Sequence, residues 1–322
     1  MLIHYESAFL AFMKKQLSTP KPESLYEPTS YIMELGGKRI RPVLALLAAD
    51  TVNDSFAESL PAALAVEIFH NFSLVHDDIM DEAPLRRGKD TVHQKWDVNT
   101  AILSGDVMLV WAYECLNAYS GDLFKELTSL LSSTARKVCE GQQYDMDFPA
   151  QSKVSQEEYL EMIRYKTAEL LGCSLQMGAL CGGVSRVASQ PFYDFGIDLG
   201  LAFQLQDDYL DAFGDPETFG KQVGGDIIEN KKTMLFLLAL ELSNTENKTI
   251  LETLFKTTPA DPSQKIEQVK ALFIQIGAAD QIKQMINYYT QKALDQVDQF
   301  PVKDEKKEIF KIFSKELMER KL

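Results

Sequence analysis

The spacing of the prolines is the feature that most constrains how this chain can fold. Three long gaps separate successive prolines, at 85–148, 150–190 and 217–258. A proline inside a helix costs about 3 kcal/mol, because it lacks the N–H donor and its ring clashes with the preceding turn. Alternating strand patterns bounded by tight turns are nearly absent. The sequence therefore predicts long helices and an all-α fold.

The hydrophobic pattern divides the chain into helical segments. Residues 57–76 and 192–206 are apolar nearly all round, which places them at the centre of a bundle. The segments after residue 245 are more polar and amphipathic, so we expect them on the outside. No linker rich in glycine, serine or proline interrupts the chain, and we predict a single all-α domain over 1–322. The predicted helices are 2–17, 27–35, 40–52, 57–80, 97–118, 121–146, 155–181, 189–212, 230–243, 246–256, 263–298 and 303–320.

The composition argues against several classes of protein. Of the 322 residues, 45% are hydrophobic and 25% are charged, as in a globular protein with a large core. A net charge of −14 argues against a nucleic-acid partner, whereas anionic substrates remain compatible because a bound metal can invert the local charge. No apolar run reaches the ~18 residues of a membrane span, and the N-terminus lacks the pattern of a signal peptide. None of the four cysteines is spaced C-x-x-C, so we expect reduced thiols in a cytoplasmic protein.

Two acidic segments of identical spelling, 77–81 and 207–211, read D-D-x-x-D at the ends of apolar helical stretches. The first and last aspartates of each segment are four positions apart and therefore share one helix face. Carboxylates stacked in this way repel one another unless a cation lies among them, and unpaired charges beside apolar helices are costly. Mg²⁺ prefers oxygen ligands and keeps part of its shell for water and phosphate. The two segments therefore predict two metal-binding faces that leave room for a diphosphate.

Basic residues recur beside these acidic segments, although the chain as a whole is acidic. They are GGKRIRP at 36–42, RRG at 86–88, the pair Lys166-Thr167, Lys221 and Lys231. The planar fork of arginine suits diphosphate oxygens, and two glycines allow the tight turn that crowds cations at a helix start. We expect a site for two phosphate-bearing groups, one bound through metal and one bound directly by lysine and arginine.

Five motifs follow one another along residues 36–233: GGKRIRP, HDDIMD with RRG, the Lys-Thr pair, FQLQDDYLD, and a basic loop that ends in NKKT. On these motifs the chain resembles the trans-isoprenyl diphosphate synthases (polyprenyl synthetases), most closely the short-chain geranylgeranyl and farnesyl diphosphate synthases. The resemblance implies an antiparallel helix bundle of the isoprenoid synthase type around a deep central apolar cavity. It also implies two or three Mg²⁺ ions per subunit and a homodimer. In one departure, Asp90 stands where the family usually has proline after R-R-G-x.

The resemblance also implies a role for each candidate site residue. The metal ligands would be Asp77, Asp81 and Asp207, supported by Asp78, Asp208 and Asp211. Isopentenyl diphosphate would be held by Lys38, Arg41, His70 and Arg87. The allylic diphosphate, or the cation that forms from it, would be contacted by Arg86, Lys166, Thr167, Gln204, Lys221 and Lys231. The catalytic residues would be the six aspartates with Arg86, Lys166 and Lys221.

The implied activity is Mg²⁺-dependent head-to-tail prenyl transfer. Basic side chains, together with bound metal, would stabilise the leaving diphosphate as the allylic C–O bond breaks. The double bond of isopentenyl diphosphate would attack the allylic cation in a site without water, and the departing diphosphate would take the proton. Phe72 and Ser73, just before the first cluster, would set product length, because an aromatic residue there accompanies shorter products in the family. The product implied is geranylgeranyl or farnesyl diphosphate.

Other interpretations stay open at this point. A class I terpene cyclase also uses D-D-x-x-D but does not need GGKRIRP and Arg87, and a longer-chain polyprenyl diphosphate synthase would share every motif. A phosphohydrolase of the H…HD…D type, suggested by His76-Asp77, would need more metal-spaced histidines than the four present. A non-catalytic regulatory subunit of a prenyl synthase should have lost some of the six aspartates, which are all intact.

Overall fold

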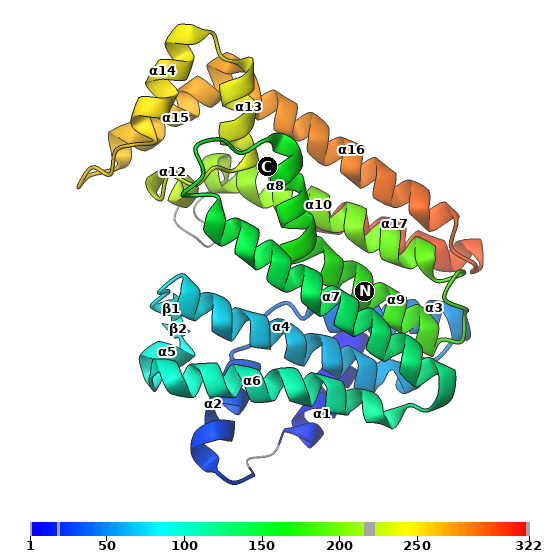
Figure 1. The fold of residues 1–322 in the computed structure, drawn as a ribbon. Coiled ribbons are helices and arrows are strands. Elements are labelled where there is room, and N and C mark those ends of the chain that lie inside the picture. The colour runs from blue at the N-terminus through cyan, green and yellow to red at the C-terminus, as the bar shows by residue number, and fades with distance from the viewer. Residues whose placement is uncertain (1, 18–19, 216–222, 320–322) are drawn as a thin grey trace. The chain divides into compact units, whose positions relative to one another are not determined.

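Helices make up nearly all of the regular structure of this protein, which we describe from a computed structural model of residues 2–17, 20–215 and 223–319 (Figure 1). The longer helices are α1 (Ile3–Gln16), α2 (Glu23–Glu34), α3 (Ile40–Asn53), α4 (Leu60–Met80), α6 (Val98–Cys115), α7 (Gly121–Asp147), α8 (Gln156–Ile163), α9 (Glu169–Cys181), α10 (Gln190–Phe213), α13 (Met234–Leu242), α14 (Thr245–Leu254), α15 (Ser263–Ile276), α16 (Ala278–Asp298) and α17 (Asp304–Met318). The short helical elements are η1 (Ala57–Ser59), α5 (Val92–Lys95), η2 (Leu116–Ala118), the π-helical η3 (Arg164–Ala168) and α12 (Gly225–Ile228). Within these residues the strands are β1 (Leu85–Arg86) and β2 (Lys89–Asp90), paired as an antiparallel hairpin. The predicted all-α fold is confirmed.

The chain divides into two compact units. Unit 1 comprises Met1–Arg136, Leu170–Tyr193 and Phe300–Val302, and unit 2 comprises Lys137–Glu169, Asp194–Gln299 and Lys303–Leu322. Three boundaries fall inside α7 and within the first turns of α9 and α10, and the other two lie in the short loop between α16 and α17. A single domain over 1–322 stays a prediction.

Helix α4 is the centre of unit 1. It packs against α1, α2, α3, α5 and α6, with α6 alongside it in Figure 1. Residues 62–69 of α4 are all buried, and each large apolar side chain among them contributes about 1.5–3 kcal/mol by leaving water. Helix α9 approaches α3 so closely that a Cβ on Gly178 would lie 2.0 Å from the carbonyl oxygen of Ala45. A Gly178→Ala change would therefore push α9 away from α3.

Helix α13 has the corresponding position in unit 2. Its residues 234–239 are all buried, and it packs against α8, α14, α15 and α16. The rings of Phe195 on α10 and Phe310 on α17 meet edge to face, with centroids 5.6 Å apart. Helices α14 to α17 bury one face each, as the sequence predicted for the last third of the chain.

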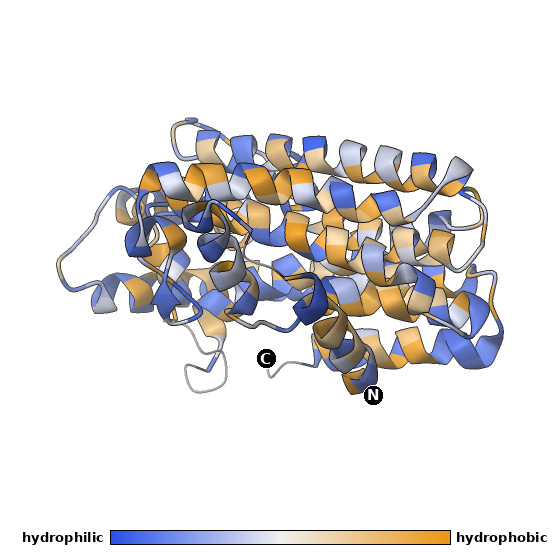
Figure 2. Cartoon of the chain, turned by 90° about the horizontal axis from the view of Figure 1, so that it is seen from below, coloured by the Kyte–Doolittle hydropathy of each residue, from blue (hydrophilic) through white to orange (hydrophobic). Residues whose placement is uncertain are grey.

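The hydropathy pattern agrees with this packing. Apolar residues alternate with polar ones along most helices, as expected where one face of each helix is buried (Figure 2). Among the described residues, no helix combines the length and apolar character needed to cross a membrane. The four cysteines are present as thiols.

The predicted helix limits need correction in a few places. The helix predicted at 27–35 begins at Glu23 and contains Pro28. The helix predicted at 263–298 is two helices, because Gly277 adopts a left-handed conformation (φ 90°) that ends α15. The segment predicted at 155–181 contains the π-helical η3, and the hairpin after α4 was not predicted. Strands of two residues are too short to show an alternating pattern.

Candidate functional site

The first aspartate cluster lies at the C-terminal end of α4. Asp78 is buried, Asp77 is half-buried and Asp81, the C-cap residue, is exposed. Arg86 on β1 grips the Asp78 carboxylate, with Nε 2.8 and 2.9 Å from the two oxygens and Nη2 2.7 Å from Oδ1. Asp78 therefore fixes the hairpin to α4, and the other two aspartates are the ones nearer to solvent.

A group of cations gathers where GGKRIRP meets the hairpin. Gly36 and Gly37 have positive φ values of 82° and 118°, so the chain turns sharply before α3. The Arg87 guanidinium donates to the Gly36 carbonyl and lies against Gly37. A Cβ on Gly37 would lie 2.7 Å from Arg87 Cζ. The second glycine is therefore required by the close approach of an arginine from the other motif, and Lys38 follows it at an exposed position.

Arg41 and His70 meet in the same group. Arg41 Nη1 lies 3.2 Å from His70 Nε2, and because a guanidinium can only donate, this ring nitrogen accepts and Nδ1 carries the proton. Burial, and then Arg41 with its neighbouring arginines, lowers the pKa of His70 well below its usual value. Burial also lowers the pKa of Arg41 and of Arg87. A neutral imidazole beside guanidinium groups provides N–H donors for an anion.

The second aspartate cluster lies near the end of α10 in unit 2. Asp208 is buried and accepts from the Tyr159 hydroxyl at 2.6 Å, from Gln204 Nε2 at 3.3 Å and from the Met234 amide at 3.4 Å. Burial, and then the nearby charge of Asp226, raises the pKa of Asp208 to about 8. Asp207 and Asp211 are less buried. The middle aspartate is therefore tied into the fold, as in the first cluster.

The sequence analysis missed Asp226, which the structure places beside the second cluster. The chain turns back at Gly224 (φ 85°), where the Asp226 amide donates to Asp211 Oδ2 at 3.0 Å. A small hollow there is lined in part by Asp208, Asp211, Asp226 and Lys231. Lys231 Nζ lies 3.7 Å from Asp226 and 2.8 Å from Glu229. The signal was the G-G-D turn between the cluster and Lys231.

Lys166 and Thr167 lie in η3, where the helical hydrogen-bond pattern widens. A Cβ on Gly141 of α7 would lie 2.4 Å from the Lys166 amide, and one on Gly200 of α10 would lie 2.7 Å from Ala168. Two helices therefore press on this segment. Lys166 Nζ lies 2.5 Å from Asp145, and Thr167 Oγ1 lies 3.5 Å from Gln204. Single π-turns inside helices frequently occur at functional sites.

The structure thus assembles the predicted residues into two groups, one in each unit. The group in unit 1 contains Lys38, Arg41, His70, Asp77, Asp78, Asp81, Arg86 and Arg87. The group in unit 2 contains Lys166, Thr167, Gln204, Asp207, Asp208, Asp211 and Lys231. Lys221 lies outside the described residues.

The donor set suits a hard cation. No group of three or more His, Cys, Asp or Glu side chains in the described ranges is arranged to hold a metal by itself. Mg²⁺ does not need such a cage, because it binds through one or two carboxylates and takes the rest of its shell from water and phosphate. Asp77 and Asp81 lie on one helix, as do Asp207 and Asp211, and all four offer carboxylate oxygens.

Phe72 and Ser73 lie on α4 before the first cluster. Phe72 is buried, and its ring meets that of His76 with centroids 4.8 Å apart. His76 in turn lies against Gly105 of α6, where a Cβ would come within 2.2 Å of Nε2. The Ser73 hydroxyl donates to the His70 carbonyl. An effect of these residues on product length remains a prediction.

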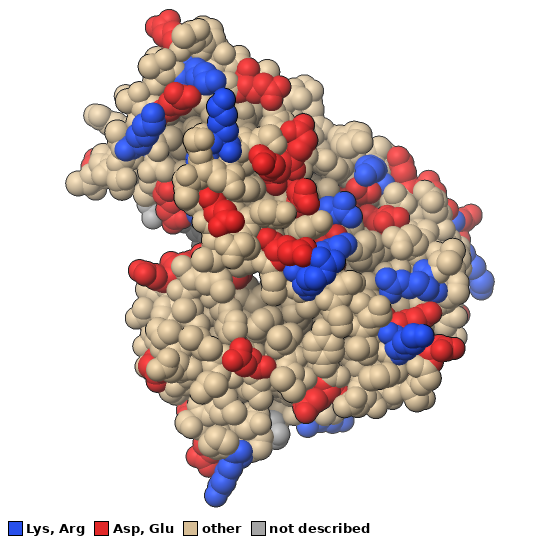
Figure 3. Space-filling model, viewed as in Figure 1, with Lys and Arg blue, Asp and Glu red and all other residues tan. Residues whose placement is uncertain are grey.

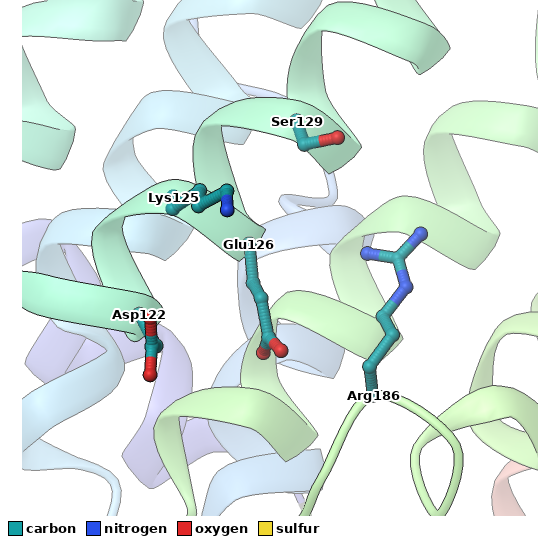
Figure 4. A pocket seen from close by; sticks show the side chains of 5 residues that line it. All are labelled: Asp122, Lys125, Glu126, Ser129 and Arg186. Carbon is teal, nitrogen blue, oxygen red and sulfur yellow. The ribbon is translucent and has the colours of Figure 1, made fainter.

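A larger hollow of about 360 Å³ contains none of the predicted residues. It is lined by Asp122, Lys125, Glu126 and Ser129 of α7 and by Arg186 from the segment after α9 (Figure 4). Acidic and basic side chains are mixed there, as they are over the face of the molecule drawn in Figure 3. Such a mixture selects no ligand of one charge, and we assign the hollow no function.

Comparisons with known proteins agree on one family. The model of the polyprenyl synthetase family matches residues 22–273. A geranylgeranyl diphosphate synthase of Methanosarcina mazei is 36% identical over 290 residues, which cover 89% of this chain and 87% of that protein. A geranylfarnesyl diphosphate synthase of Natronomonas pharaonis is 38% identical over 245 residues, which cover 70% of this chain and 72% of that protein. A crystal structure of a geranylgeranyl pyrophosphate synthase has a TM-score of 0.95 and 49% identity, over 100% of this chain and 99% of that chain.

Proposed function

This chain belongs to the polyprenyl synthetase family, and on that premise we propose that it joins isopentenyl diphosphate to an allylic diphosphate to give geranylgeranyl diphosphate. As a member, it is a prenyltransferase of isoprenoid biosynthesis that forms short-chain products. The observation that carries the proposal is the contact of Arg41 with a neutral His70 beside Arg87, in the unit that also carries the first aspartate cluster.

The cations of unit 1 are proposed to hold isopentenyl diphosphate. Lys38, Arg41 and Arg87 supply charge, and the Nδ1–H of His70 supplies a neutral donor. Guanidinium forks match two phosphate oxygens at once, which a single ammonium group cannot do. This substrate keeps its diphosphate throughout the reaction, so a site made of direct hydrogen bonds is sufficient.

The allylic diphosphate is proposed to bind through Mg²⁺ and through basic side chains. Two or three Mg²⁺ ions would be held by Asp77, Asp81 and Asp207, with Asp78, Asp208 and Asp211 supporting them. When bound, the metal would offset the charge of the diphosphate and help it leave. The direct contacts would come from Arg86, Lys166, Thr167, Gln204, Lys221 and Lys231.

The reaction needs positioning and exclusion of water more than a conventional base. The allylic C–O bond breaks, and basic side chains such as Lys166 stabilise the charge that develops on the leaving oxygens. The double bond of isopentenyl diphosphate then attacks the allylic cation, and a proton leaves the new product for the departed diphosphate. Apolar side chains must line the reacting carbons, because water would capture the cation.

The assignment of product length has two supports. Phe72 is an aromatic residue one turn or so before Asp77, where it could limit the growing chain, and Ser73 beside it is small. Relatives named geranylgeranyl diphosphate synthase resemble the chain over most of its length. A geranylfarnesyl product is the second candidate, because relatives of similar identity carry that name.

A homodimer is proposed from the surface of α6. Val98, Ile102, Leu103 and Val110 are exposed large apolar residues on this one helix, and contiguous apolar patches on a surface mark interaction sites. Light scattering after gel filtration should give twice the mass of 36.3 kDa. Leu103→Glu with Val110→Glu should give the monomer.

A product assay tests the proposed function. The protein is incubated with Mg²⁺, labelled isopentenyl diphosphate and one of three starters, namely dimethylallyl, geranyl or farnesyl diphosphate, and the hydrolysed products are sized by chromatography. We expect geranylgeraniol as the main alcohol. No incorporation with any starter would refute prenyl transfer, and a longer main alcohol would replace geranylgeranyl with the second candidate.

A further inference from the structure

Arg39 is a buried charge between two candidate ligands of isopentenyl diphosphate. Lys38 is exposed and Arg41 is partly exposed, whereas Arg39 has only 4% of its surface exposed. Its guanidinium donates to the Glu67 carboxylate on α4 and to the Met33 carbonyl on α2. The side chains of Arg39 and Glu67 are 2% and 3% exposed. The Arg39 side chain therefore joins the start of α3 to α4 through an ion pair and to α2 through a hydrogen bond.

The backbone at Arg39 is also unusual. Arg39 is the N-cap residue of α3 and adopts a left-handed conformation, with φ 46° and ψ 32°. An L-residue with a long side chain enters this region only at a cost, and it stays there where the surrounding contacts hold it. The contacts to Glu67 and Met33 supply that restraint. They hold the guanidinium in place, and the side chain in turn holds the backbone of Arg39 in its left-handed conformation.

Glu67 has further partners in the same group. Asn71 Nδ2 donates to its Oε1 at 3.0 Å and to its carbonyl at 2.8 Å. Burial lowers the pKa of Arg41 and of Arg87, and the Glu67 charge opposes both shifts. A buried anion at this point lets several guanidinium groups lie close together before any anionic substrate has arrived.

We propose that Arg39 and Glu67 are positioning residues of the isopentenyl diphosphate site. Their ion pair fixes the first turn of α3 and its left-handed cap, so that Lys38 and Arg41 face the diphosphate while Arg39 itself points inward. Neither member of the pair touches the substrate. The inference rests on the proposed function, because that function assigns Lys38 and Arg41 to isopentenyl diphosphate.

Steady-state kinetics of Arg39→Met and Glu67→Gln test the proposal. We expect the KM for isopentenyl diphosphate to rise about tenfold with kcat nearly unchanged, because binding is lost equally from ground and transition states. The KM for the allylic diphosphate should not change. Equal rises in both KM values, or no rise in either, would overturn the proposal. Arg39→Lys keeps the charge but lacks the planar fork of the guanidinium, and its KM should lie between those of wild type and Arg39→Met.

Two further variants separate positioning from stability. Arg39→Met with Glu67→Met removes both buried charges, so its Tm should recover relative to the single variants while the KM for isopentenyl diphosphate stays high. A return of that KM to the wild-type value would overturn the proposal. Tyr5→Phe removes a hydrogen bond of 2.8 Å to Asp50 near the other end of α3. This control should lower Tm and leave both KM values unchanged.

Calorimetry distinguishes a failure of this inference from a failure of the proposed function. Isopentenyl diphosphate is titrated into wild type and Arg39→Met without Mg²⁺ or allylic substrate. We expect about tenfold weaker binding to the variant, which corresponds to the expected rise in KM. Equal affinities would overturn the positioning role. Wild type that binds the compound but incorporates none would refute the proposed reaction and leave the positioning result standing.

Discussion

The two D-D-x-x-D clusters are spelled alike but are held by different chemistry. In the first, the middle aspartate, Asp78, is gripped by the Arg86 guanidinium through contacts of 2.7–2.9 Å. In the second, Asp208 accepts from a tyrosine hydroxyl, a glutamine amide and a backbone N–H, none of which carries charge. The middle aspartate of the same motif therefore forms an ion pair in unit 1 and a network of uncharged hydrogen-bond donors in unit 2.

The difference shows what the middle aspartate does in each cluster. Both Asp78 and Asp208 are buried and bound to protein groups, so each ties a cluster to its own unit. The first and last aspartates of each cluster are less buried, and they are the carboxylates suited to metal and diphosphate. Within one motif, position separates residues that support the fold from residues that we propose to face substrate.

The largest expected effect is on activity, and it tests whether the clusters act together. Asp77→Asn and Asp207→Asn each remove a proposed metal ligand, and each should lower kcat by about 10²–10³-fold, the cost of losing one strong electrostatic stabiliser. Initial rates at saturating substrate and Mg²⁺ measure this. Asp122→Asn, in the hollow that holds no predicted site residue, is the control. A large loss in one variant alone would make one cluster catalytic and the other structural.

The next effect is on stability, and it tests the difference between the middle aspartates. Asp78→Asn leaves Arg86 without its counter-charge and should cost about 2 kcal/mol of unfolding free energy, reduced by the partial exposure of Arg86. Asp208→Asn keeps an oxygen acceptor for neutral donors and should cost less than about 1 kcal/mol at pH 4, where Asp208 is uncharged in the folded state. Urea unfolding of both variants compares the two costs. Equal costs would remove the distinction between ion pair and neutral network.

Per pH unit, a smaller effect is expected in the pH dependence of stability without divalent metal. The pKa of Asp208 is about 8 in the folded protein and about 3.9 when unfolded. Between these values the folded state holds a proton that the unfolded state releases, so this group makes stability fall as pH rises, by at most about 1.4 kcal/mol per pH unit. Urea unfolding from pH 4 to 8 measures the unfolding free energies of wild type and Asp208→Asn. The difference between the two should show this slope. A flat difference would mean that folded Asp208 is already ionised.

The smallest expected effect concerns the product and not the rate. Five residues before the second cluster stands Ala202, whereas Phe72 occupies that place before the first. Phe72→Ala therefore gives the first cluster the small side chain that the second already has. The main product should become longer, as chromatography of the hydrolysed products would show. An unchanged product profile would exclude the ring as a limit on chain length.

Much of the fold could be predicted because long amphipathic and apolar helices leave a strong periodic signal. The segment predicted at 40–52 is α3 to within one residue, and the one at 121–146 is α7. The π-helical η3 could not be predicted, because one widened turn barely changes the apolar spacing. The short hairpin of β1 and β2 depends on a contact between Arg86 and Asp78, which a local pattern does not contain.

The site residues that belong to sequence motifs could be predicted, whereas those that are defined by contacts between distant segments could not. The charged residues of GGKRIRP look alike in the sequence, yet Arg39 points into the core, where it pairs with Glu67. Glu67 lies 28 positions further along the chain, so no local pattern indicates this contact. Asp226 was not predicted, because it lies outside both D-D-x-x-D segments and contacts Asp211 only through a turn of the chain. These assignments depend on which helices pack together, and single-sequence patterns do not report that.

The lack of space at Gly37 has a practical consequence for engineering. Residue 37 and Arg87 belong to motifs 50 positions apart, yet a methyl group on the first would occupy the place of the guanidinium of the second. The two motifs can therefore be exchanged between related proteins only together. A chimera that imports the hairpin with its arginines into a related scaffold should work only if the recipient also has glycine at the position of residue 37. Libraries that randomise the two loops independently would consist mainly of mismatched pairs.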